Sequence, residues 1–274
     1  MKLLTLIRNW LARKLGYCGT GTTTTTTTLE PETNSSETGE TPETVTEETT
    51  QEPTGIISID TSIISNPSTL NTRLVVLLDN GHASTTPGKR SPDGQLREYE
   101  VNRDLVSRIS KGLTKKGIRN YIIVPEVDVD VALSKRADRA NQYCDEYGKD
   151  NCLFISVHVN AAGNGTEWMN GRGFSVWTTK GKTKSDEYAD IFWDEMNEVL
   201  TPLGMTMRKD TSDGDKDYES NFTVIYKTKC AALLTENLFM DNKIDKRFLM
   251  TDEGRQAIAD GHVNAIMRIA TMLK

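Results

Sequence analysis

The 274-residue sequence lacks the features that define several large classes of protein. It contains no apolar run of about 20 residues, so no segment is predicted to cross a membrane as a helix. Only four cysteines are present, too few for a fold held together by disulfides. Apolar residues make up 36% of the chain, less than in most globular proteins. Histidine is also scarce, with three residues, so each one is a candidate for a specific role.

Charge of one sign is missing from each of two amino-terminal stretches. Residues 1–18 contain four basic residues and no acid, whereas residues 19–71 contain nine acids and no base. Removing these contributions of +4 and −9 from the net charge of −6 leaves −1 for residues 72–274. A domain that binds nucleic acid would present a basic surface, so nucleic acid is not predicted as a partner.

Residues 1–18 form a basic amphipathic segment in which leucine or isoleucine recurs every four positions, at 3, 7, 11 and 15. Three interpretations remain open for it. Cys18 before a threonine-rich stretch is typical of a lipoprotein signal, although Tyr17 is bulky for that role and two arginines interrupt the apolar core. The segment also fits a helix lying on a membrane surface, or an amino terminus without a role. The first two predict membrane attachment.

Residues 19–71 are predicted to be a disordered linker. They begin with a run of seven threonines and continue as a Glu/Thr/Pro stretch with almost nothing to bury. The more apolar segment 56–65 within this linker is predicted to dock as an edge strand. Residues 72–274 then remain as one domain, because about 200 residues support a single well-buried core.

Within residues 72–274, apolar β-branched runs alternate with helical patterns. Strands are predicted at 73–79, 119–125, 152–160, 173–179, 222–227 and 231–238, and helices at 100–116, 134–147, 184–200 and 253–273. This alternation predicts an α/β fold, a single domain with a mostly parallel sheet covered by helices on both faces. In such sheets the site lies at the carboxyl ends of the strands.

Four residues with suitable chemistry lie at these predicted positions: His82, Glu98, His158 and Glu236. Two imidazoles and a carboxylate can hold zinc with one position open, and a further carboxylate can act as a general base. Each residue also has a structural explanation, such as a turn histidine, a core histidine or an acid in the first turn of a helix. Glu236 is the hardest to explain structurally, because a carboxylate within AALLTENLF must be desolvated or paired.

Five motifs in order resemble the zinc-dependent N-acetylmuramoyl-L-alanine amidases of the amidase 3 family, which are bacterial and phage peptidoglycan hydrolases. The motifs are DNGH (79–82), E-x-x-V-N (98–102), the run Arg136, Ala140 and Asn141, ISVHVNA (155–161) and LLTENLFMDN (233–242). The resemblance covers about residues 73–273. The chain departs from the family at GHAS, where GHGG is usual, and at Asn237, where glycine is usual.

The resemblance implies a role for each site residue. His82, Glu98 and His158 would bind one zinc ion, and Glu236 would be the catalytic carboxylate. Glu100 competes with Glu98, but only Glu98 places Val101 and Asn102 in the family pattern. The implied reaction is hydrolysis of the amide between N-acetylmuramic acid and L-alanine of the stem peptide. Two rivals remain, a carboxypeptidase-like zinc peptidase and a non-catalytic peptidoglycan-binding protein.

Two residues are predicted to contact the substrate. Asn160 could donate a hydrogen bond to it or cap the end of its strand, and Arg208 could meet the acidic stem peptide or pair with acids of the loop 210–219. That loop is predicted to be solvated, because its glycine is not where an EF-hand needs one. His262 is predicted to be a packing or surface residue. Cys144 and Cys152 are close enough in sequence to pair, whereas Cys230 is predicted to be a buried free thiol.

The expected partner is peptidoglycan, and the expected location is the cell envelope or periplasm. The sequence does not decide between a bacterial autolysin and a phage endolysin. A monomer is predicted.

Overall fold

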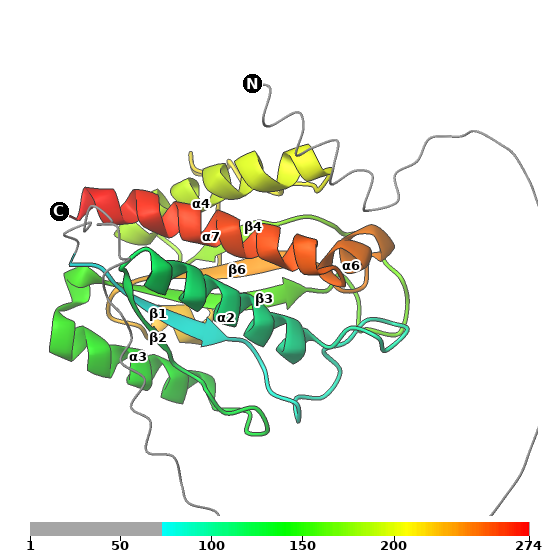
Figure 1. Ribbon diagram of the computed structural model, residues 1–274, viewed down its shortest axis with the longest axis horizontal. Coiled ribbons are helices and arrows are strands. Elements are labelled where there is room, and N and C mark those ends of the chain that lie inside the picture. Colours follow the sequence, from blue (N-terminus) through cyan, green and yellow to red (C-terminus); the bar gives the residue numbers. More distant parts are fainter. Residues whose placement is uncertain (1–72, 274) are drawn as a thin grey trace, which may run out of the picture.

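A six-stranded sheet forms the centre of the part of the chain that the computed structural model describes, residues 73–273 (Figure 1). The strands are β1 (Val75–Asn80), β2 (Arg119–Ile122), β3 (Cys152–Asn160), β4 (Ser175–Thr178), β5 (Tyr218–Glu219) and β6 (Ala231–Phe239). Their order in the sheet is β2-β1-β3-β6-β4-β5. All neighbouring strands are parallel except β4 and β6, which are antiparallel.

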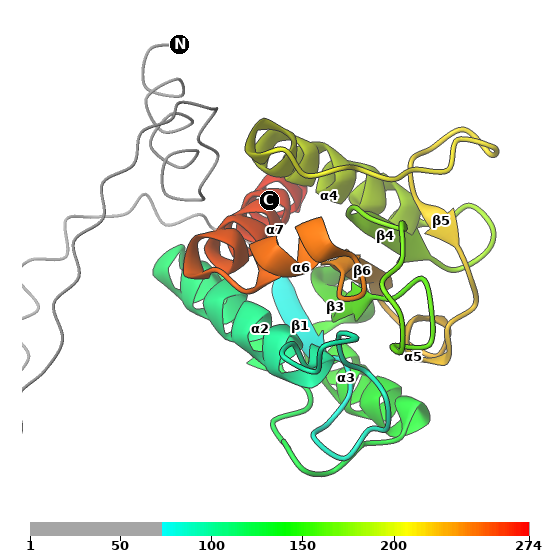
Figure 2. The ribbon, with the colours of Figure 1, turned by 90° about the vertical axis from the view of Figure 1, so that its right-hand side faces the viewer.

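Helices cover both faces of this sheet (Figure 2). The helices are α2 (Glu98–Lys115), α3 (Leu133–Tyr147), α4 (Lys184–Leu200), α5 (Thr223–Tyr226), α6 (Lys243–Leu249) and α7 (Asp252–Met272), with short 3₁₀ turns at Lys149–Asn151 and Thr201–Leu203. One face packs against α2, α4 and α7, and the other packs against α3 and α5. The predicted α/β single domain with a mostly parallel, doubly covered sheet is confirmed.

The sequence pattern explains why these elements form. In α2, Val101, Leu105, Ile109 and Leu113 recur every four residues and are all buried against the sheet. In β1, all six residues are buried, as expected for a strand covered on both faces. Gly117 follows α2 with φ +74°, a left-handed conformation that glycine adopts without strain and that ends the helix.

The predicted strand 222–227 is wrong, because most of this segment is the short helix α5. Phe222 O accepts hydrogen bonds from the backbone N–H groups of Ile225 and Tyr226, and the side chains of Val224 and Ile225 are buried. A short apolar run can be buried as a strand or as one helical turn, and periodicity over six residues does not separate the two.

Several predicted boundaries also change. The strands expected at 119–125 and 173–179 shorten to β2 and β4, the two-residue strand β5 was not predicted, and α2 begins at Glu98 rather than at residue 100. The closing helix is preceded by the separate helix α6. The predictions for residues 1–18, for the linker 19–71 and for the edge strand 56–65 lie outside the described residues.

The structure also tests the predictions for three cysteines and for His262. Cys144, Cys152 and Cys230 are buried free thiols, so the pairing considered for Cys144 and Cys152 is absent and the prediction for Cys230 is confirmed. His262 is a packing residue with no exposed surface. Its Nε2 lies 3.1 Å from the Thr235 hydroxyl and its Nδ1 lies 2.9 Å from Ile258 O.

Candidate metal centre and active site

The topology brings the four predicted site residues to one edge of the sheet. β1, β3 and β6 are parallel neighbours, so their carboxyl ends meet there. His82 lies two residues beyond β1, His158 lies near the end of β3, and Glu236 lies beside it in β6 as its register partner. Glu98 reaches the same place as the first residue of α2.

His82, Glu98 and His158 form a compact set of three donors. One ligand atom from each lies within 4.8 Å of the others. His158 Nδ1 is 3.0 Å from Glu98 Oε1, and His82 Nε2 is 3.3 Å from Glu98 Oε2. The Glu98 side chain is 1% exposed, whereas the two imidazoles are 18% and 16% exposed. Two imidazole nitrogens and one carboxylate oxygen at this spacing fit a single metal ion.

The backbone before His82 is shaped for this contact. A Cβ atom at Gly81 would lie 2.2 Å from His158 Cε1, so only glycine leaves room for the second imidazole. His82 itself has φ +65°, a conformation that is uncommon outside glycine. Its ring meets the His158 ring edge to face, with 4.9 Å between centroids. The loop therefore holds His82 in an uncommon backbone conformation that directs its imidazole to Glu98.

Glu98 is buried as an anion because donors surround it. Although burial alone would raise it, contacts with His158 and His82 hold the pKa of Glu98 well below its ordinary value. Val159 N–H donates to Glu98 Oε1 at 3.2 Å, and Asn102 Nδ2 lies 3.4 Å from the same oxygen while donating to Gly81 O at 3.1 Å. Asn102 thus joins the acid to the His82 loop.

This positioning role of Asn102 was not predicted. The available signal was its spacing, since Glu98 and Asn102 are four residues apart and therefore share one face of a helix. Glu100, the alternative ligand, is exposed and accepts a hydrogen bond from the Tyr99 hydroxyl instead.

Glu236 lies beside the cluster in a different electrostatic state. Burial raises the pKa of Glu236 to about 7, with the His158 imidazole acting in the opposite direction and Glu98 adding to the rise. Glu236 Oε2 is buried without a hydrogen-bond partner in the described part of the chain. Asn237, at the position where the resemblance leads one to expect glycine, donates through Nδ2 to His158 O at 3.0 Å. The departure from the family pattern therefore links the two site strands.

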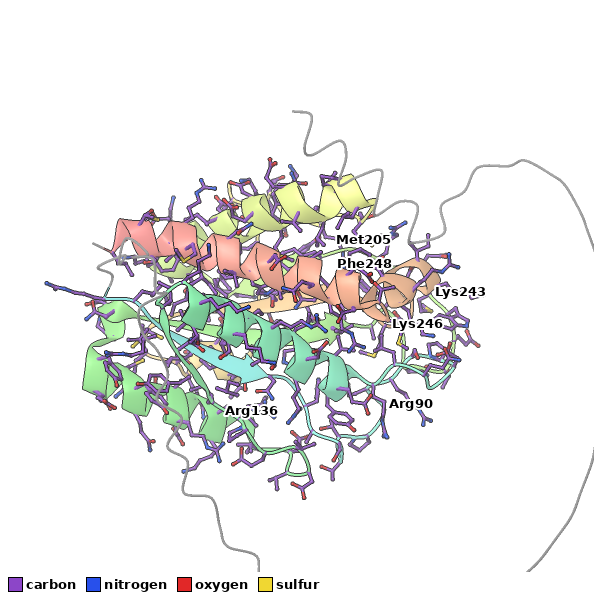
Figure 3. The ribbon with its side chains drawn as sticks, in the orientation of Figure 1. Arg90, Arg136, Met205, Lys243, Lys246 and Phe248 are labelled. Carbon is purple, nitrogen blue, oxygen red and sulfur yellow. The ribbon has the colours of Figure 1, made fainter. Side chains whose placement is uncertain are left out.

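A buried ion pair between Arg136 and Asp79 holds the end of β1 at this edge. Arg136, which α3 contributes from the face opposite α7, lies 2.9 Å from Asp79 Oδ1 and donates to Asn80 O and Val131 O (Figure 3). Ser156 donates to the other Asp79 oxygen at 2.6 Å. Both charged side chains are at most 2% exposed. Arg136 therefore fixes the end of β1, from which the His82 loop departs.

The two predicted substrate contacts have different surroundings. Asn160 caps its strand locally, because its Oδ1 accepts from Ala161 N–H at 2.8 Å, while its Nδ2 has no partner among residues 73–273. The Arg208 guanidinium lies 5.0 Å from the Phe239 ring and 5.5 Å from the Tyr218 ring. It forms no ion pair with the acids of the 210–219 loop, and its charge reaches Glu236 and opposes the rise in pKa there.

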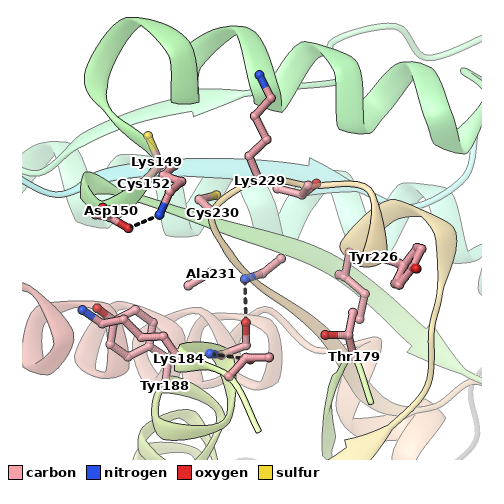
Figure 4. A pocket seen from close by; sticks show the side chains of 15 residues that line it. Lys149, Asp150, Cys152, Thr179, Lys184, Tyr188, Tyr226, Lys229, Cys230 and Ala231 are labelled. Atoms are coloured by element: carbon pink, nitrogen blue, oxygen red, sulfur yellow. Dashed lines mark hydrogen bonds and ion pairs between the residues drawn. The ribbon is translucent and has the colours of Figure 1, made fainter. Parts of the chain in front are cut away.

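A cavity of about 350 Å³ lies at the other end of the same strands, where β3 and β6 begin (Figure 4). Its lining includes Cys152, Cys230, Lys184 and Tyr188, and none of the four predicted site residues. The cluster of His82, Glu98 and His158 therefore lies away from this cavity, at the carboxyl ends of the parallel strands.

Similar solved structures share this fold. The structure of an N-acetylmuramoyl-L-alanine amidase from Clostridium difficile 630 superposes with a TM-score of 0.60 and 21% identity, covering 71% of this chain and 95% of that one. The catalytic domain of CwlV, an N-acetylmuramoyl-L-alanine amidase from Bacillus (Paenibacillus) polymyxa, gives a TM-score of 0.60 at 19% identity over 73% and 99% of the two chains.

Curated relatives match the same region in sequence. The N-acetylmuramoyl-L-alanine amidase CwlM of Bacillus licheniformis is 28% identical over 200 residues, which are 73% of this chain and 70% of that protein. An endolysin of Bacillus phage SPP1 is 26% identical over 203 residues, 73% of this chain and 67% of its own length. The model of the amidase 3 family, described as N-acetylmuramoyl-L-alanine amidase, matches residues 76–268. Because that match spans most of the chain and contains the whole His/Glu/His cluster, the protein belongs to the amidase 3 family of N-acetylmuramoyl-L-alanine amidases, which are peptidoglycan hydrolases.

Proposed function

We propose that this amidase uses one zinc ion, held by His82, Glu98 and His158, and that Glu236 is its general base. The observation that carries the proposal is the contrast between the two acids at this edge. Two imidazoles and the Val159 N–H keep Glu98 anionic, whereas burial raises the pKa of Glu236 to about 7. A pKa near the working pH suits a group that must accept a proton and then release it.

The donor set supports zinc. Two imidazoles and one carboxylate with a fourth position left open are typical of catalytic zinc sites. A bound zinc ion would supply Lewis acidity, which polarises a carbonyl and makes water easier to deprotonate. Metal analysis of the purified protein by mass spectrometry tests this assignment, with about one zinc per chain as the expected result.

The chain's own residues account for the proton transfers. Glu236 would remove a proton from the attacking water and deliver it to the amine of L-alanine as the amide bond breaks. Asn237 and Asn102 hold the residues on either side of this path, through His158 O and Gly81 O. The Oε2 atom of Glu236 is buried, and burial raises the pKa of this carboxyl to about 7, close to the working pH.

Substrate binding is assigned to Asn160 and Arg208. The Nδ2 group of Asn160 is free to donate to a substrate carbonyl. The Arg208 guanidinium carries a positive charge between two aromatic rings, without a carboxylate partner among the described residues. A stem peptide carries carboxylates, and an arginine oriented by ring contacts is suited to bind one in a bidentate manner.

The test is product analysis of purified peptidoglycan digested with the zinc-loaded full-length chain. Free stem peptides beginning with L-alanine, together with glycan strands whose muramic acid residues carry bare lactyl groups, are the expected products. Glu236→Gln keeps the side-chain shape and should retain zinc while losing about 10²–10⁴-fold in turnover. Shortened peptides still attached to glycan would identify a peptidase and overturn the assignment.

The site of action is the cell envelope, where peptidoglycan lies, and residues 1–18 are proposed to attach the enzyme to a membrane there. No helix within residues 73–273 is long and apolar enough to cross a membrane. Vesicle sedimentation of the full-length chain beside a variant lacking residues 1–18 tests this attachment. All four proposed site residues belong to one chain, so a monomer would suffice for catalysis, and light scattering measures the oligomeric state.

A further inference from the structure

Lys89 is a cation at the catalytic edge whose side chain is not used by the fold. Its ammonium lies 4.0 Å from Glu98 Oε2, which is within ion-pair distance but too long for a hydrogen bond. The side chain is 46% exposed, and within residues 73–273 its ammonium donates no hydrogen bond. Arg136 differs, since its charge is buried and fully paired with Asp79. The ammonium donors of Lys89 therefore remain available to a ligand.

The backbone fixes the place of Lys89 although the side chain is exposed. Glu98 N–H donates to Lys89 O at 2.9 Å, which ties this residue to the first turn of α2. The next residue, Arg90, pairs with Arg97 through an antiparallel bridge. Arg90 lies in the loop beyond the end of β1 (Figure 3). The side chain of Lys89 therefore starts from a fixed point beside Glu98.

The backbone conformation of Lys89 belongs to a pattern at this edge. Among residues 73–273, three residues other than glycine have a positive φ, namely His82 (+65°), Lys89 (+30°) and Leu238 (+69°). His82 is a proposed metal ligand, and Leu238 lies two residues beyond Glu236. Such conformations cost free energy and cluster where a protein must hold particular side chains in place. The pattern supports a role for Lys89 at the site.

A counter-ion for Glu98 is the simplest structural role for Lys89, but other groups already fill it. Glu98 contacts two imidazoles and the Val159 N–H at 3.0 to 3.3 Å. The Lys89 ammonium is farther away, and solvent screens a half-exposed charge. A metal ion bound by Glu98 would also take over its negative charge. Lys89 would then have no anionic partner in the protein.

The charge of Lys89 also reaches the proposed general base. Burial raises the pKa of Glu236, and Lys89 acts against this rise more strongly than Arg208 does. The ammonium therefore lies close to both Glu98 and Glu236. The proposed mechanism places the scissile amide between these two acids, so Lys89 borders the position of the reacting bond.

We propose that Lys89 binds the first carboxylate of the stem peptide, on the residue that follows L-alanine. This inference rests on the proposed function. Consecutive Cα atoms are about 3.8 Å apart, so a cation beside the scissile amide is suited to a group on the next residue. In peptidoglycan that residue is a D-glutamate joined through its γ-carboxyl, which leaves its α-carboxyl free or amidated. Lys89 favours the free acid, because an ammonium forms its strongest hydrogen bonds with a carboxylate.

The test compares L-alanyl-D-glutamate with L-alanyl-D-isoglutamine, which differ only in the α-carboxyl of the second residue. Neither peptide contains the amide that the enzyme is proposed to cleave, so calorimetric titration of the full-length, zinc-loaded chain measures binding alone. The acid should bind about tenfold more tightly than the amide. The matching N-acetylmuramyl dipeptides should show the same preference in kcat/KM, through KM. Equal affinities and equal KM values would overturn the proposal.

Variants assign the preference to one side chain. Lys89→Met keeps the length of the side chain and removes its charge, so it should bind acid and amide equally. Lys89→Arg keeps the positive charge and should restore most of the preference. Lys111→Met is the matched control, because Lys111 is an exposed lysine of α2 without an ion pair among the described residues. Circular dichroism and zinc content verify the fold and the metal site. A preference that survives in Lys89→Met would overturn the proposal.

Failure of this proposal and failure of the proposed function give different results. Hydrolysis of peptidoglycan to free stem peptides, without any preference between acid and amide, would refute only the role of Lys89. Zinc-free protein, or full turnover by Glu236→Gln, would refute the proposed mechanism whatever the preference between the two peptides.

Discussion

Glu98 and Asp217 are two acids with 1% of their surface exposed, yet their surroundings leave them in opposite states. Glu98 meets two imidazoles and a backbone N–H, and its pKa is held low. Asp217 meets one hydroxyl and another acid, and its pKa is raised. Burial opposes the charged form in both cases. The difference shows that the donors around a buried acid, more than burial itself, decide whether it stays charged.

Asp79 completes the comparison. It is also 1% exposed, but it has a full partner in Arg136 and a second donor in Ser156. The three acids therefore differ in their partners. Asp79 pairs with an arginine, Glu98 contacts two imidazoles, and Asp217 contacts another acid. Only Asp79 has a permanent cationic partner within the protein. We expect the state of Glu98 to depend on bound metal and that of Asp217 to depend on pH.

The largest effect is expected from breaking the Arg136–Asp79 pair. Arg136→Met leaves Asp79 buried without its cation and removes the donors to Asn80 O and Val131 O. The cost should be about 3–5 kcal/mol in the free energy of unfolding, measured by urea denaturation. Arg139→Met is the control, because Arg139 pairs with the partly exposed Glu126 and should cost about 1 kcal/mol or less. Equal losses in the two variants would contradict this account.

The second largest effect is expected on metal affinity. Glu98→Gln keeps the shape of the side chain but removes its negative charge, so metal affinity should fall by at least about 100-fold. Competition with a chromophoric chelator measures this change. Glu100→Gln, two residues away and exposed, should bind metal as the wild type does. If instead Glu100→Gln lost the metal and Glu98→Gln kept it, the ligand set would be wrong.

The sequence predicts the fold class and the edge at which these acids gather, but not their partners. Long apolar runs such as β1 and β3 are visible as strands, and His82, Glu98, His158 and Glu236 lie where the ends of parallel strands meet. The prediction fails for short elements. Residues 222–227 form mostly a helix, because tertiary packing decides the conformation of a run too short for periodicity.

Contacts between distant segments are also invisible in the sequence. The acidic loop was expected to be solvated, since five acids in ten residues usually face water. Asp217 is buried because β5 pairs with β4, which places it against Thr178, 39 residues earlier in the chain. A two-residue strand has no hydrophobic pattern that would reveal this pairing.

A smaller effect is expected from changing Arg208, one of the two proposed substrate contacts. Arg208→Met keeps a long apolar stem against Phe239 and Tyr218 but removes the charge, so KM for stem-peptide substrates should rise about tenfold, with kcat little changed. The adjacent Lys209→Met is the control, because the Lys209 ammonium lies over Trp193 instead. A fall in kcat at constant KM would mean that Arg208 acts on the reacting groups and not on substrate binding.

The smallest effect should appear in the pH dependence of stability. The folded-state pKa of Asp217 is raised above its ordinary value of 3.8 to about 7, so the folded state holds the proton more tightly than the unfolded state. Its contribution to stability is therefore complete below about pH 4 and is lost as the pH rises through about 7. Tm should fall across this window in wild type and less in Asp217→Asn, whose amide cannot ionise. A Tm that rises across the window equally in both proteins would show that Asp217 does not titrate there, and the contrast with Glu98 would fail.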